Sequence, residues 1–441
     1  MNTNKIRSLS NYRVFPLLMR VGKEETVTIV PIGEDLKFND DIEYLIRIVP
    51  NDSYGNRLVC FEEKGWETHI HAYSQNGILT FKHTFNSEKK WTIGITTDED
   101  YQKKKRPKEV YVYSLFEDLY ERLPYMGDLH CHSTGSDGKD DPAILAANYR
   151  KEGFDFFALT DHWKMEPSRK MIKAYDGVKL GIKLFKGEEV HDPTGCIHIV
   201  NFGGQSSINE IIQNDPDAVA AEVRELSETL SVPDDVGLFE YSYRVWITRH
   251  IRSVGGLAIT AHPCWRSGLS MMNSMSNSMY RYVMETGEFD ALELVTGELS
   301  KENNLQSAIY YEEVAKGIKI PIVGSSDSHG TDPANLFGIG RTVVFAKDSE
   351  FDTLCTAIKD MYSVAIETQP GEEPRVLGSF RLVNYTHFLL DHYFPLHDEL
   401  CVEEGILMRE FILGNTHAGE LLGELSDRVE KYARKILRNE D

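Results

Sequence analysis

Nine histidine, aspartate and glutamate residues stand out in this sequence because each lies at or just after the end of a short apolar run. Imidazole and carboxylate groups are the side chains that hold divalent metal ions in proteins. Groups of this kind at the ends of neighbouring strands meet in space even when they are far apart in the sequence. The pattern therefore predicts a site for several metal ions. The nine residues are His130, His132, Asp137, His162, Glu189, His198, His262, Asp327 and His329.

Two pairs among these residues have a spacing of two positions. His130 and His132 form the first pair, and Asp327 and His329 form the second. Side chains at positions i and i+2 of a β-strand project from the same face. Each pair can therefore direct both of its side chains toward one ion.

Taken together and in this order, the fragments around these residues resemble the polymerase and histidinol phosphatase (PHP) family, whose members are metal-dependent phosphoesterases and exonucleases. The resemblance covers about residues 127 to 368 and implies a distorted barrel of seven strand-helix units. The fragments are Asp-Leu-His130-Cys-His132, Ser-Asp137-Gly, Leu-Thr-Asp161-His162, Gly-Glu188-Glu189-Val, Cys-Ile-His198, Ala-His262-Pro and Ser-Ser-Asp327-Ser-His329-Gly.

The resemblance also implies how the nine residues are shared among three ions. We choose Glu189 over its neighbour Glu188 because Glu189 falls on the glutamate of the family's Gly-x-Glu pattern. Trp163 occupies a position where many relatives carry a small or acidic residue, so the substrate pocket is expected to differ here. The implied ligands are His130, His132, Glu189 and Asp327 for the first ion, Glu189, His198 and His262 for the second, and Asp137, His162 and His329 for the third.

The elements that must position these residues can be read from the hydrophobic pattern. Near-continuous apolar runs predict strands that are buried on both faces, and helical patterns at 141–152 and 301–316 alternate with them. This alternation predicts an α/β fold with a parallel sheet or barrel, in agreement with the resemblance. The predicted strands are 126–132, 154–160, 184–190, 197–202, 257–261, 291–296 and 320–325.

Two further domains are expected in a chain of 441 residues. Residues 1–105 contain short β-branched and aromatic runs between turn residues, which is typical of an antiparallel β-sandwich-like domain. Its predicted strands are 26–32, 42–49, 67–73, 78–85 and 91–97. Residues 374–441 predict a helical C-terminal extension, since apolar positions recur there at helical spacing. Residues 127–368 would form the PHP-type barrel between them.

Composition restricts the cellular location and the partners. The chain has no long apolar stretch, no secretory signal pattern at its start and no Cys-x-x-Cys pair, so we expect a cytoplasmic protein with reduced thiols and without membrane partners. Its net charge of −21 disfavours binding to long nucleic acid, because such binding depends on neutralising phosphates. A small phosphorylated substrate fits better, although a short oligonucleotide that reaches the ions stays an alternative. The sequence does not indicate an oligomeric state.

An insertion at about 205–252 carries arginine and aromatic residues between two predicted strands. Arg244 and Arg249 are predicted to bind substrate, since guanidinium groups bind phosphate through two hydrogen bonds. A surface helix with solvated cations is an equally weighted interpretation. Residues 270–279 are polar and rich in methionine, which is typical of either a lid that closes on substrate or an ordinary loop.

The predicted function is hydrolysis of a phosphate ester by a metal-activated water at a trinuclear site. Two or three ions of Zn, Mn or Fe are expected, because imidazole mixed with carboxylate suits these metals better than Mg or Ca. We predict catalytic roles for Asp161, through orienting a ligand histidine, and for Arg266. A helix-capping role is the alternative for Asp161.

Three other functions remain as alternatives. The first is an exonuclease or oligoribonuclease that uses the same ions. The second is a non-catalytic, metal-stabilised binding module, which is disfavoured because none of the nine ligand positions is missing. The third is an amide hydrolase, which is disfavoured by the absence of a recognisable metal-bridging lysine motif.

Overall fold

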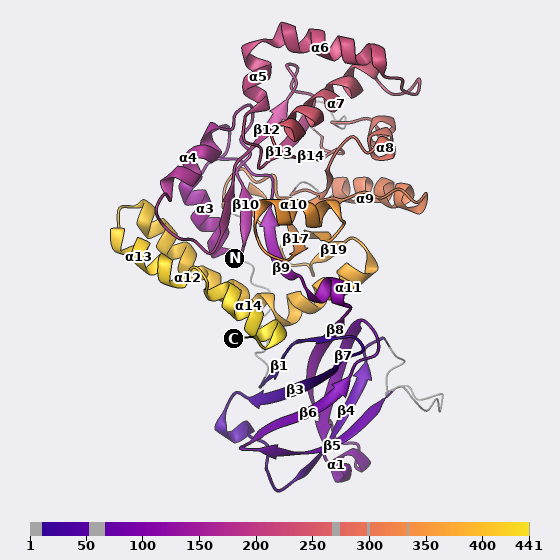
Figure 1. Cartoon of the computed structure of the whole chain (residues 1–441), viewed down its shortest axis with the longest axis vertical. Helices are drawn as coiled ribbons and strands as arrows, with labels where there is room; N and C mark the ends of the chain where they lie inside the picture. The colour runs from indigo at the N-terminus through magenta and orange to yellow at the C-terminus, as the bar shows by residue number, and fades with distance from the viewer. Residues whose placement is uncertain (1–10, 53–66, 267–273, 298–299, 333–334, 441) are drawn as a thin grey trace. The chain divides into compact units, whose positions relative to one another are not determined.

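The computed structural model describes residues 11–52, 67–266, 274–297, 300–332 and 335–440, which divide into two compact units (Figure 1). The larger unit consists of Pro124–Val383 and Asp398–Asp427. The smaller unit consists of the described residues up to Leu123, Asn384–His397 and the residues from Arg428 onward. The predicted metal ligands all belong to the larger unit.

The smaller unit contains one eight-stranded sheet in the order β1-β3-β6-β5-β4-β7-β8-β2. We expected two packed sheets, but β5 pairs with β4 over Thr68–Tyr73 and with β6 over Ser74–Gln75, so it joins both halves. The five predicted strands are confirmed within a few residues. The strands are β1 (Tyr12–Phe15), β2 (Leu18–Arg20), β3 (Glu24–Pro31), β4 (Glu43–Pro50), β5 (Thr68–Gln75), β6 (Ile78–Thr84), β7 (Lys89–Thr96) and β8 (Lys108–Leu115), with short helices η1 (Glu34–Leu36), α1 (Asp98–Gln102) and α2 (Glu117–Tyr120).

The larger unit contains two sheets, in the orders β11-β10-β9-β17-β18-β19 and β12-β13-β14-β15-β16. All seven predicted strands of this region are present, although the run 184–190 divides into two strands. The strands are β9 (Leu123–Asp128), β10 (Phe156–Ala158), β11 (Lys183–Phe185), β12 (Gly187–His191), β13 (His198–Phe202), β14 (Leu257–Thr260), β15 (Ala291–Val295), β16 (Ile322–Gly324), β17 (Gly340–Ala346), β18 (Ser363–Glu367) and β19 (Arg375–Leu377).

The direction of one strand differs from the prediction. β13 pairs antiparallel with both β12 and β14. The pairs β9–β10, β14–β15 and β15–β16 are parallel. Isolated bridges between Cys131 and Ser328 and between His162 and Glu189 connect segments from the two sheets. The expectation of uniformly parallel strands was therefore wrong for β13, which follows β12 through a short connection.

Helices α3 and α9 agree with the two helical patterns seen in the sequence. Asp141 caps the first turn of α3 by accepting hydrogen bonds from the amides of Ala143 and Ile144, and Pro142 occupies its first position. The helices of the larger unit up to residue 360 are α3 (Pro142–Lys151), α4 (Glu166–Ala174), α5 (Ile208–Asn214), α6 (Pro216–Thr229), α7 (Leu238–Ser253), α8 (Asn277–Thr286), α9 (Ser300–Ala315) and α10 (Phe351–Lys359).

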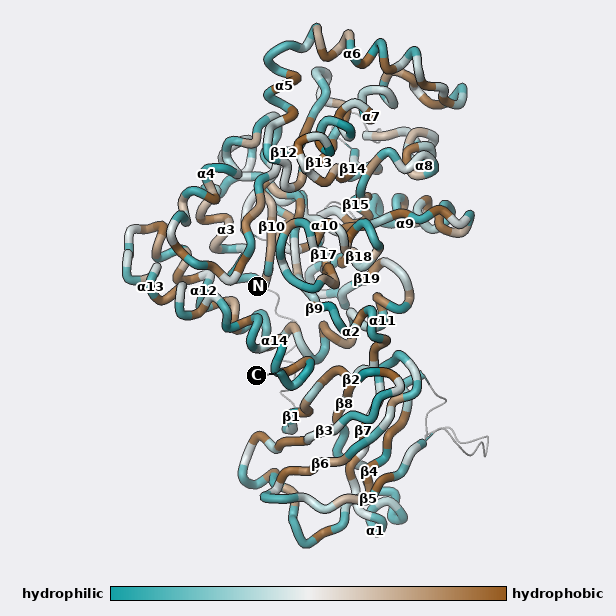
Figure 2. The backbone as a smooth tube through the Cα atoms, in the orientation of Figure 1, coloured by the Kyte–Doolittle hydropathy of each residue, from teal (hydrophilic) through white to brown (hydrophobic). Residues whose placement is uncertain are grey.

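The insertion folds as α5, α6 and α7, which lie together beside β12–β14 (Figure 1). Buried residues of α7, among them Trp246 and Ile251, share one hydrophobic cluster with Ile199 of β13 and Ala258 of β14. In Figure 2 the hydrophobic residues follow central strands such as β10, whereas α6 alternates hydrophobic and hydrophilic positions. One face of the insertion therefore covers the sheet. Residues 270–273 of the predicted lid lie outside the described residues.

The C-terminal segment is helical as predicted, after the short strand β19. Its helices are α11 (Phe380–His392), α12 (Phe394–Ile412), α13 (Thr416–Leu425) and α14 (Arg428–Arg438). In the larger unit, the buried Arg150 of α3 forms an ion pair of 2.7 Å with the buried Glu404 of α12. Within the described residues, no helix has both the length and the apolar character required to cross a lipid bilayer.

Candidate metal centre

The nine predicted ligands converge at one edge of the strands of the larger unit. His130 and His132 follow β9, His162 follows β10, His262 follows β14, and Asp327 and His329 follow β16. Glu189 lies within β12, and His198 is the first residue of β13. Because β13 runs in the opposite direction, its first residue lies at the same edge as the last residues of its neighbours. Strand order and direction thus bring distant residues into one cluster.

The carboxylate of Glu189 is the centre of this cluster. Its Oε1 lies 2.8 Å from His198 Nδ1 and 3.1 Å from His262 Nε2. Its Oε2 lies 3.5 Å from His130 Nε2, and the Oδ1 of Asp327 lies 3.4 Å from the same nitrogen. Each oxygen of Glu189 therefore faces a different group of histidines, which is the geometry of a carboxylate that bridges two ions.

The adjacent glutamate points away from these histidines. Glu188 accepts hydrogen bonds from Ser207 Oγ, the amide of Ile208 and the side-chain amides of Asn201 and Asn209. These groups lie in β13 and at the start of α5. Since neighbouring residues of a strand face opposite sides, Glu188 stabilises the insertion while Glu189 faces the cluster. Of the two glutamates, Glu189 is thus the one whose carboxylate faces the histidines, and its role as a ligand stays a prediction.

A second group of ligands lies next to the first. The Oδ2 of Asp137 lies 3.5 Å from His162 Nε2 and 3.4 Å from His329 Nε2. The ring of His132 stacks against those of both His162 and His329, with ring centroids 4.1 and 4.5 Å away. The donor atoms of these four residues all lie within 4.8 Å of one another. Asp137 is the most exposed of the four, so this group opens toward solvent.

Several backbones near the cluster adopt the left-handed conformation, which residues other than glycine rarely use. The φ angles are +65° at Trp163, +24° at His262 and +51° at Asp327. Such strain persists only where the surrounding structure imposes it, and it gathers at functional sites. Each of the three residues follows the end of a strand, so the strain occurs where the chain turns its side chains into the cluster.

The charges in the cluster shift the ionisation of its members strongly. Burial favours the neutral imidazole of His162, but Asp137 and Glu189 outweigh it and raise the pKa of His162 to about 10. Burial would raise the pKa of Glu189, yet the surrounding histidines hold this pKa well below its usual range. Without metal, these carboxylates are therefore charged and balanced by histidine protons, which bound cations can replace.

The donor atoms fit divalent cations better than they fit one another. Among the described residues, the buried atoms His130 Nε2, His132 Nδ1 and Glu189 Oε2 have no hydrogen-bond partner. An unpaired buried polar atom is costly unless another ligand satisfies it. Buried nitrogen and oxygen donors gathered around one carboxylate form a set that could hold divalent metal ions.

Two residues of the centre were missed in the sequence. Glu293 in β15 is fully buried, and its carboxylate accepts a hydrogen bond of 2.7 Å from the amide of His262 and lies 3.2 Å from His130 Nδ1. His191 lies two positions after Glu189, and its Nε2 is 3.3 Å from Glu189 Oε2. The Glu-x-His spacing within a strand was the signal for His191. The sequence carried no comparable signal for Glu293.

The predicted catalytic residues lie beside the ligands in the sequence. Asp161 is buried and accepts hydrogen bonds from the amide and hydroxyl of Ser133, at 2.9 and 2.7 Å, and from Ser136 Oγ, at 2.6 Å. These contacts hold the loop that leads to Asp137, so Asp161 acts on the loop through its serines. Arg266 is half-buried, four residues after His262, and its catalytic role stays a prediction.

The two arginines predicted to bind substrate, both in α7, already have partners. Arg244 is buried and binds Glu240 at 2.9 Å, and Arg249 pairs with Glu288 at 3.3 Å. Glu288 lies just before the first residue of β15, and Arg249 lies in the last turns of α7 before β14. This end of the strands is opposite the one that carries His262. The position of Arg249 therefore does not support the prediction that it binds substrate.

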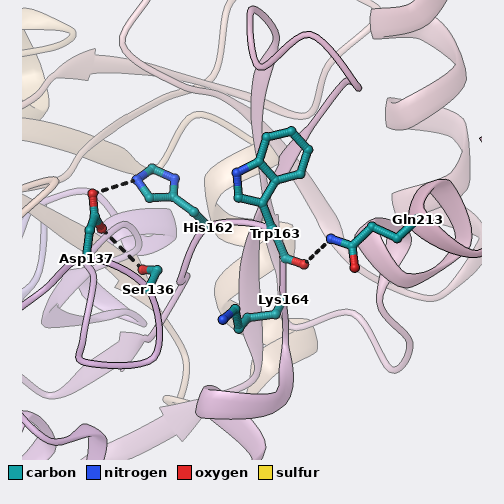
Figure 3. Close-up of a pocket in the computed structure, with 6 residues that line it drawn as sticks. All are labelled: Ser136, Asp137, His162, Trp163, Lys164 and Gln213. Carbon is teal, nitrogen blue, oxygen red and sulfur yellow. Dashed lines mark hydrogen bonds and ion pairs between the residues drawn. The ribbon is translucent and has the colours of Figure 1, made fainter.

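A pocket of about 580 Å³ opens beside the second ligand group, and its wall includes Asp137 and His162. Figure 3 shows the indole of Trp163 upright beside His162, with the Trp163 carbonyl accepting a hydrogen bond of 2.8 Å from Gln213 Nε2. Ser136 and Lys164 complete the described lining. A substrate in this pocket would lie against the exposed edge of the cluster.

No protein-family model matches the sequence, and no curated protein matches it. One solved structure similar to the chain is a two-domain Bacteroides vulgatus protein containing a predicted PHP-like metal-dependent phosphoesterase, with 17% identity and a TM-score of 0.39. The match covers 56% of this chain and 65% of that protein. A putative metal-dependent phosphoesterase from Bifidobacterium adolescentis (18%, TM-score 0.33) and an amidohydrolase from Chromobacterium violaceum with bound sulfate and no metal (18%, TM-score 0.31) each match 47% of this chain and 89% of their own.

The match spans less than two thirds of the Bacteroides protein, and all three TM-scores are below 0.5. Two of the three structures carry the phosphoesterase name that the sequence resemblance predicted. The assignment of function below rests on the geometry of the histidine and carboxylate cluster.

Proposed function

We propose that this chain is a metal-dependent phosphoesterase that hydrolyses a small phosphorylated substrate at a centre of two or three divalent ions. The observation that carries this proposal is the placement of Glu189, whose two oxygens face two different sets of histidines. A carboxylate that joins two ions a few ångströms apart is typical of phosphoester hydrolases with two-metal sites. The ions are Zn, Mn or Fe, in keeping with the imidazole-rich donor set.

Residues of the chain supply the positioning. Divalent ions at such a centre lower the pKa of water and neutralise charge on phosphoryl oxygens. Glu189 and Asp327 hold the interior of the cluster, while Asp137 and His329 form its exposed side. Asp161 keeps the loop of Asp137 in place through Ser133 and Ser136. Trp163 and Lys164 line the pocket from which a substrate would approach.

The strand connections support the PHP-type barrel as part of this proposal. The first sheet pairs β9 with β10, and the second contains β12 to β16 in order. The bridge between His162 and Glu189 joins the segment after β10 to β12. The bridge between Cys131 and Ser328 joins the segment after β9 to the segment after β16. These connections support, as part of the proposal, a distorted barrel within residues 127–368.

The test compares two adjacent buried carboxylates of β12. Metal-stripped protein is reloaded with Zn, Mn or Fe, its metal content is measured, and hydrolysis is assayed with p-nitrophenyl phosphate, a panel of phosphorylated metabolites and a short oligonucleotide. We expect Glu189→Gln to lose both metal and hydrolysis. We expect Glu188→Gln to retain both at lower thermal stability, because its hydrogen bonds hold α5 and not the cluster.

Loaded wild-type protein that hydrolyses none of these compounds would refute the proposal, as would a Glu189→Gln variant with full activity. Faster turnover of the oligonucleotide than of the metabolites would favour the exonuclease alternative. Bound metal without any turnover would favour the binding-module alternative.

A further inference from the structure

We propose that His191 is a metal ligand, and that it forms a metal position with Glu189 and His162 in addition to the three ligand sets implied by the nine residues. The inference rests on the proposed function only for the presence of divalent ions in this cluster. It adds a tenth ligand and an alternative location for one ion.

Three donor atoms define this position. His162 Nδ1 lies 2.6 Å from Glu189 Oε2, His191 Nε2 lies 3.3 Å from the same oxygen, and the two nitrogens are 2.9 Å apart. Ligand atoms that bind one ion at about 2.0–2.2 Å stand roughly 3.0–3.5 Å from one another. The distance of 3.3 Å lies within this range, and the other two, 2.6 and 2.9 Å, are shorter, so the three atoms face one common point that is slightly narrower than a cation would impose.

Hydrogen bonding within the chain does not satisfy this group. In the described part of the chain, the buried atom Glu189 Oε2 has no hydrogen-bond partner. Two imidazole nitrogens at 2.9 Å can share only one proton, so the pair by itself leaves Oε2 without a well-directed donor. A cation bound by all three atoms would remove this deficit.

The side chain and the backbone of His191 are both held in place by neighbouring residues. The indole of Trp163 stacks on it with ring centroids 4.6 Å apart and an angle of 23° between the planes. The side chain of Asn209 accepts a hydrogen bond of 3.1 Å from the amide of His191. The left-handed backbone of Trp163, with φ of +65°, turns the indole into this position. A ligand oriented in this way loses little side-chain freedom when an ion binds.

His162 belongs to two of the candidate positions. Its Nδ1 faces Glu189 and His191, whereas its Nε2 faces Asp137 at 3.5 Å. A neutral imidazole has one free lone pair and therefore binds one ion. The outermost ion thus has two alternative positions, one with Asp137 and His329 and one with His191 and Glu189. Two imidazoles with one carboxylate favour zinc or iron(II) at the second position.

The experiment removes each alternative separately and then both. Metal-free wild-type protein, His191→Gln, Asp137→Asn and the double variant are titrated with zinc against a chromophoric chelator, and the number and affinity of bound ions are measured. We expect each single variant to retain the outermost zinc ion and the double variant to lose it. Zinc binding by the double variant that equals binding by Asp137→Asn alone would overturn the proposal, whatever the total number of ions.

Two controls protect the result against misfolding. His191→Phe keeps an aromatic ring against Trp163 but has no nitrogen, so in the Asp137→Asn background it should behave as His191→Gln does. His250→Gln changes a histidine of α7 that stacks on Trp246 at 3.7 Å outside the cluster, and it should leave zinc binding unchanged. The metal-free variants should melt close to wild type. Wild-type protein that binds no zinc would refute the proposed function as well. Equal zinc binding by Asp137→Asn and by the double variant would refute this inference alone.

Discussion

Replacement of Glu293 by glutamine tests whether a buried carboxylate outside the ligand set holds two ligands in place. The nitrogen His130 Nε2 faces Glu189 and Asp327, so Nδ1 carries the proton and donates it to Glu293 Oε1 at 3.2 Å. The other oxygen of Glu293, Oε2, accepts a hydrogen bond of 2.7 Å from the backbone amide of His262. Glutamine keeps one oxygen and replaces the other by an NH2 group, so one of the two donors must face another donor.

The expected effect on metal binding can be worked from these contacts. Loss of a partner that orients a ligand histidine typically reduces metal affinity about 10- to 100-fold, which is about 1.4–2.8 kcal/mol. Glu293 and His130 are fully buried, so solvent cannot replace the lost acceptor. The metal-free variant should also lose about 1–3 kcal/mol of unfolding free energy, because one buried donor is left unsatisfied.

The assay is zinc binding by chelator competition together with urea unfolding of metal-free protein. Glu188→Gln is the matched control, since it is equally buried but its hydrogen bonds go to β13 and the start of α5. It should lower stability without changing zinc affinity. If Glu293→Gln binds zinc as tightly as wild type, or if both variants weaken zinc binding equally, the positioning role of Glu293 is wrong.

Three further predictions follow from the larger unit. His130→Ala combined with His132→Ala should abolish metal content and phosphatase activity, and survival of hydrolysis in that variant would refute the metal assignment. Arg150→Met should destabilise the protein by about 3–5 kcal/mol in urea unfolding, because it leaves Glu404 charged and buried; a combined Glu404→Leu change should recover much of this loss. Zinc binding at pH 7 should release protons into a weakly buffered indicator solution, since His162 has a pKa of about 10 in metal-free protein and must lose its proton to bind. Zinc affinity should therefore rise with pH up to about 10, and an affinity independent of pH between 6 and 9 would contradict this.

Much of the fold could be predicted from the sequence, because hydrophobic patterns act locally. The runs at 154–160 and 257–261 are buried strands, and the pattern at 141–152 is a helix. The reversed direction of β13 could not be predicted, since an apolar run does not show which way its strand runs. The single sheet of the smaller unit depends in the same way on the pairing of β5 with both halves.

The sequence by itself determined the set of candidate ligands, since each histidine or carboxylate stands beside an apolar run that must be buried. The preference for Glu189 over Glu188 came from the family resemblance, through its Gly-x-Glu pattern. Only the tertiary structure decided that Glu293 contacts His130 and that Arg249 lies at the opposite end of the strands. The physical reason is that strand pairing and direction bring side chains together across more than a hundred residues, and no local pattern encodes those neighbours.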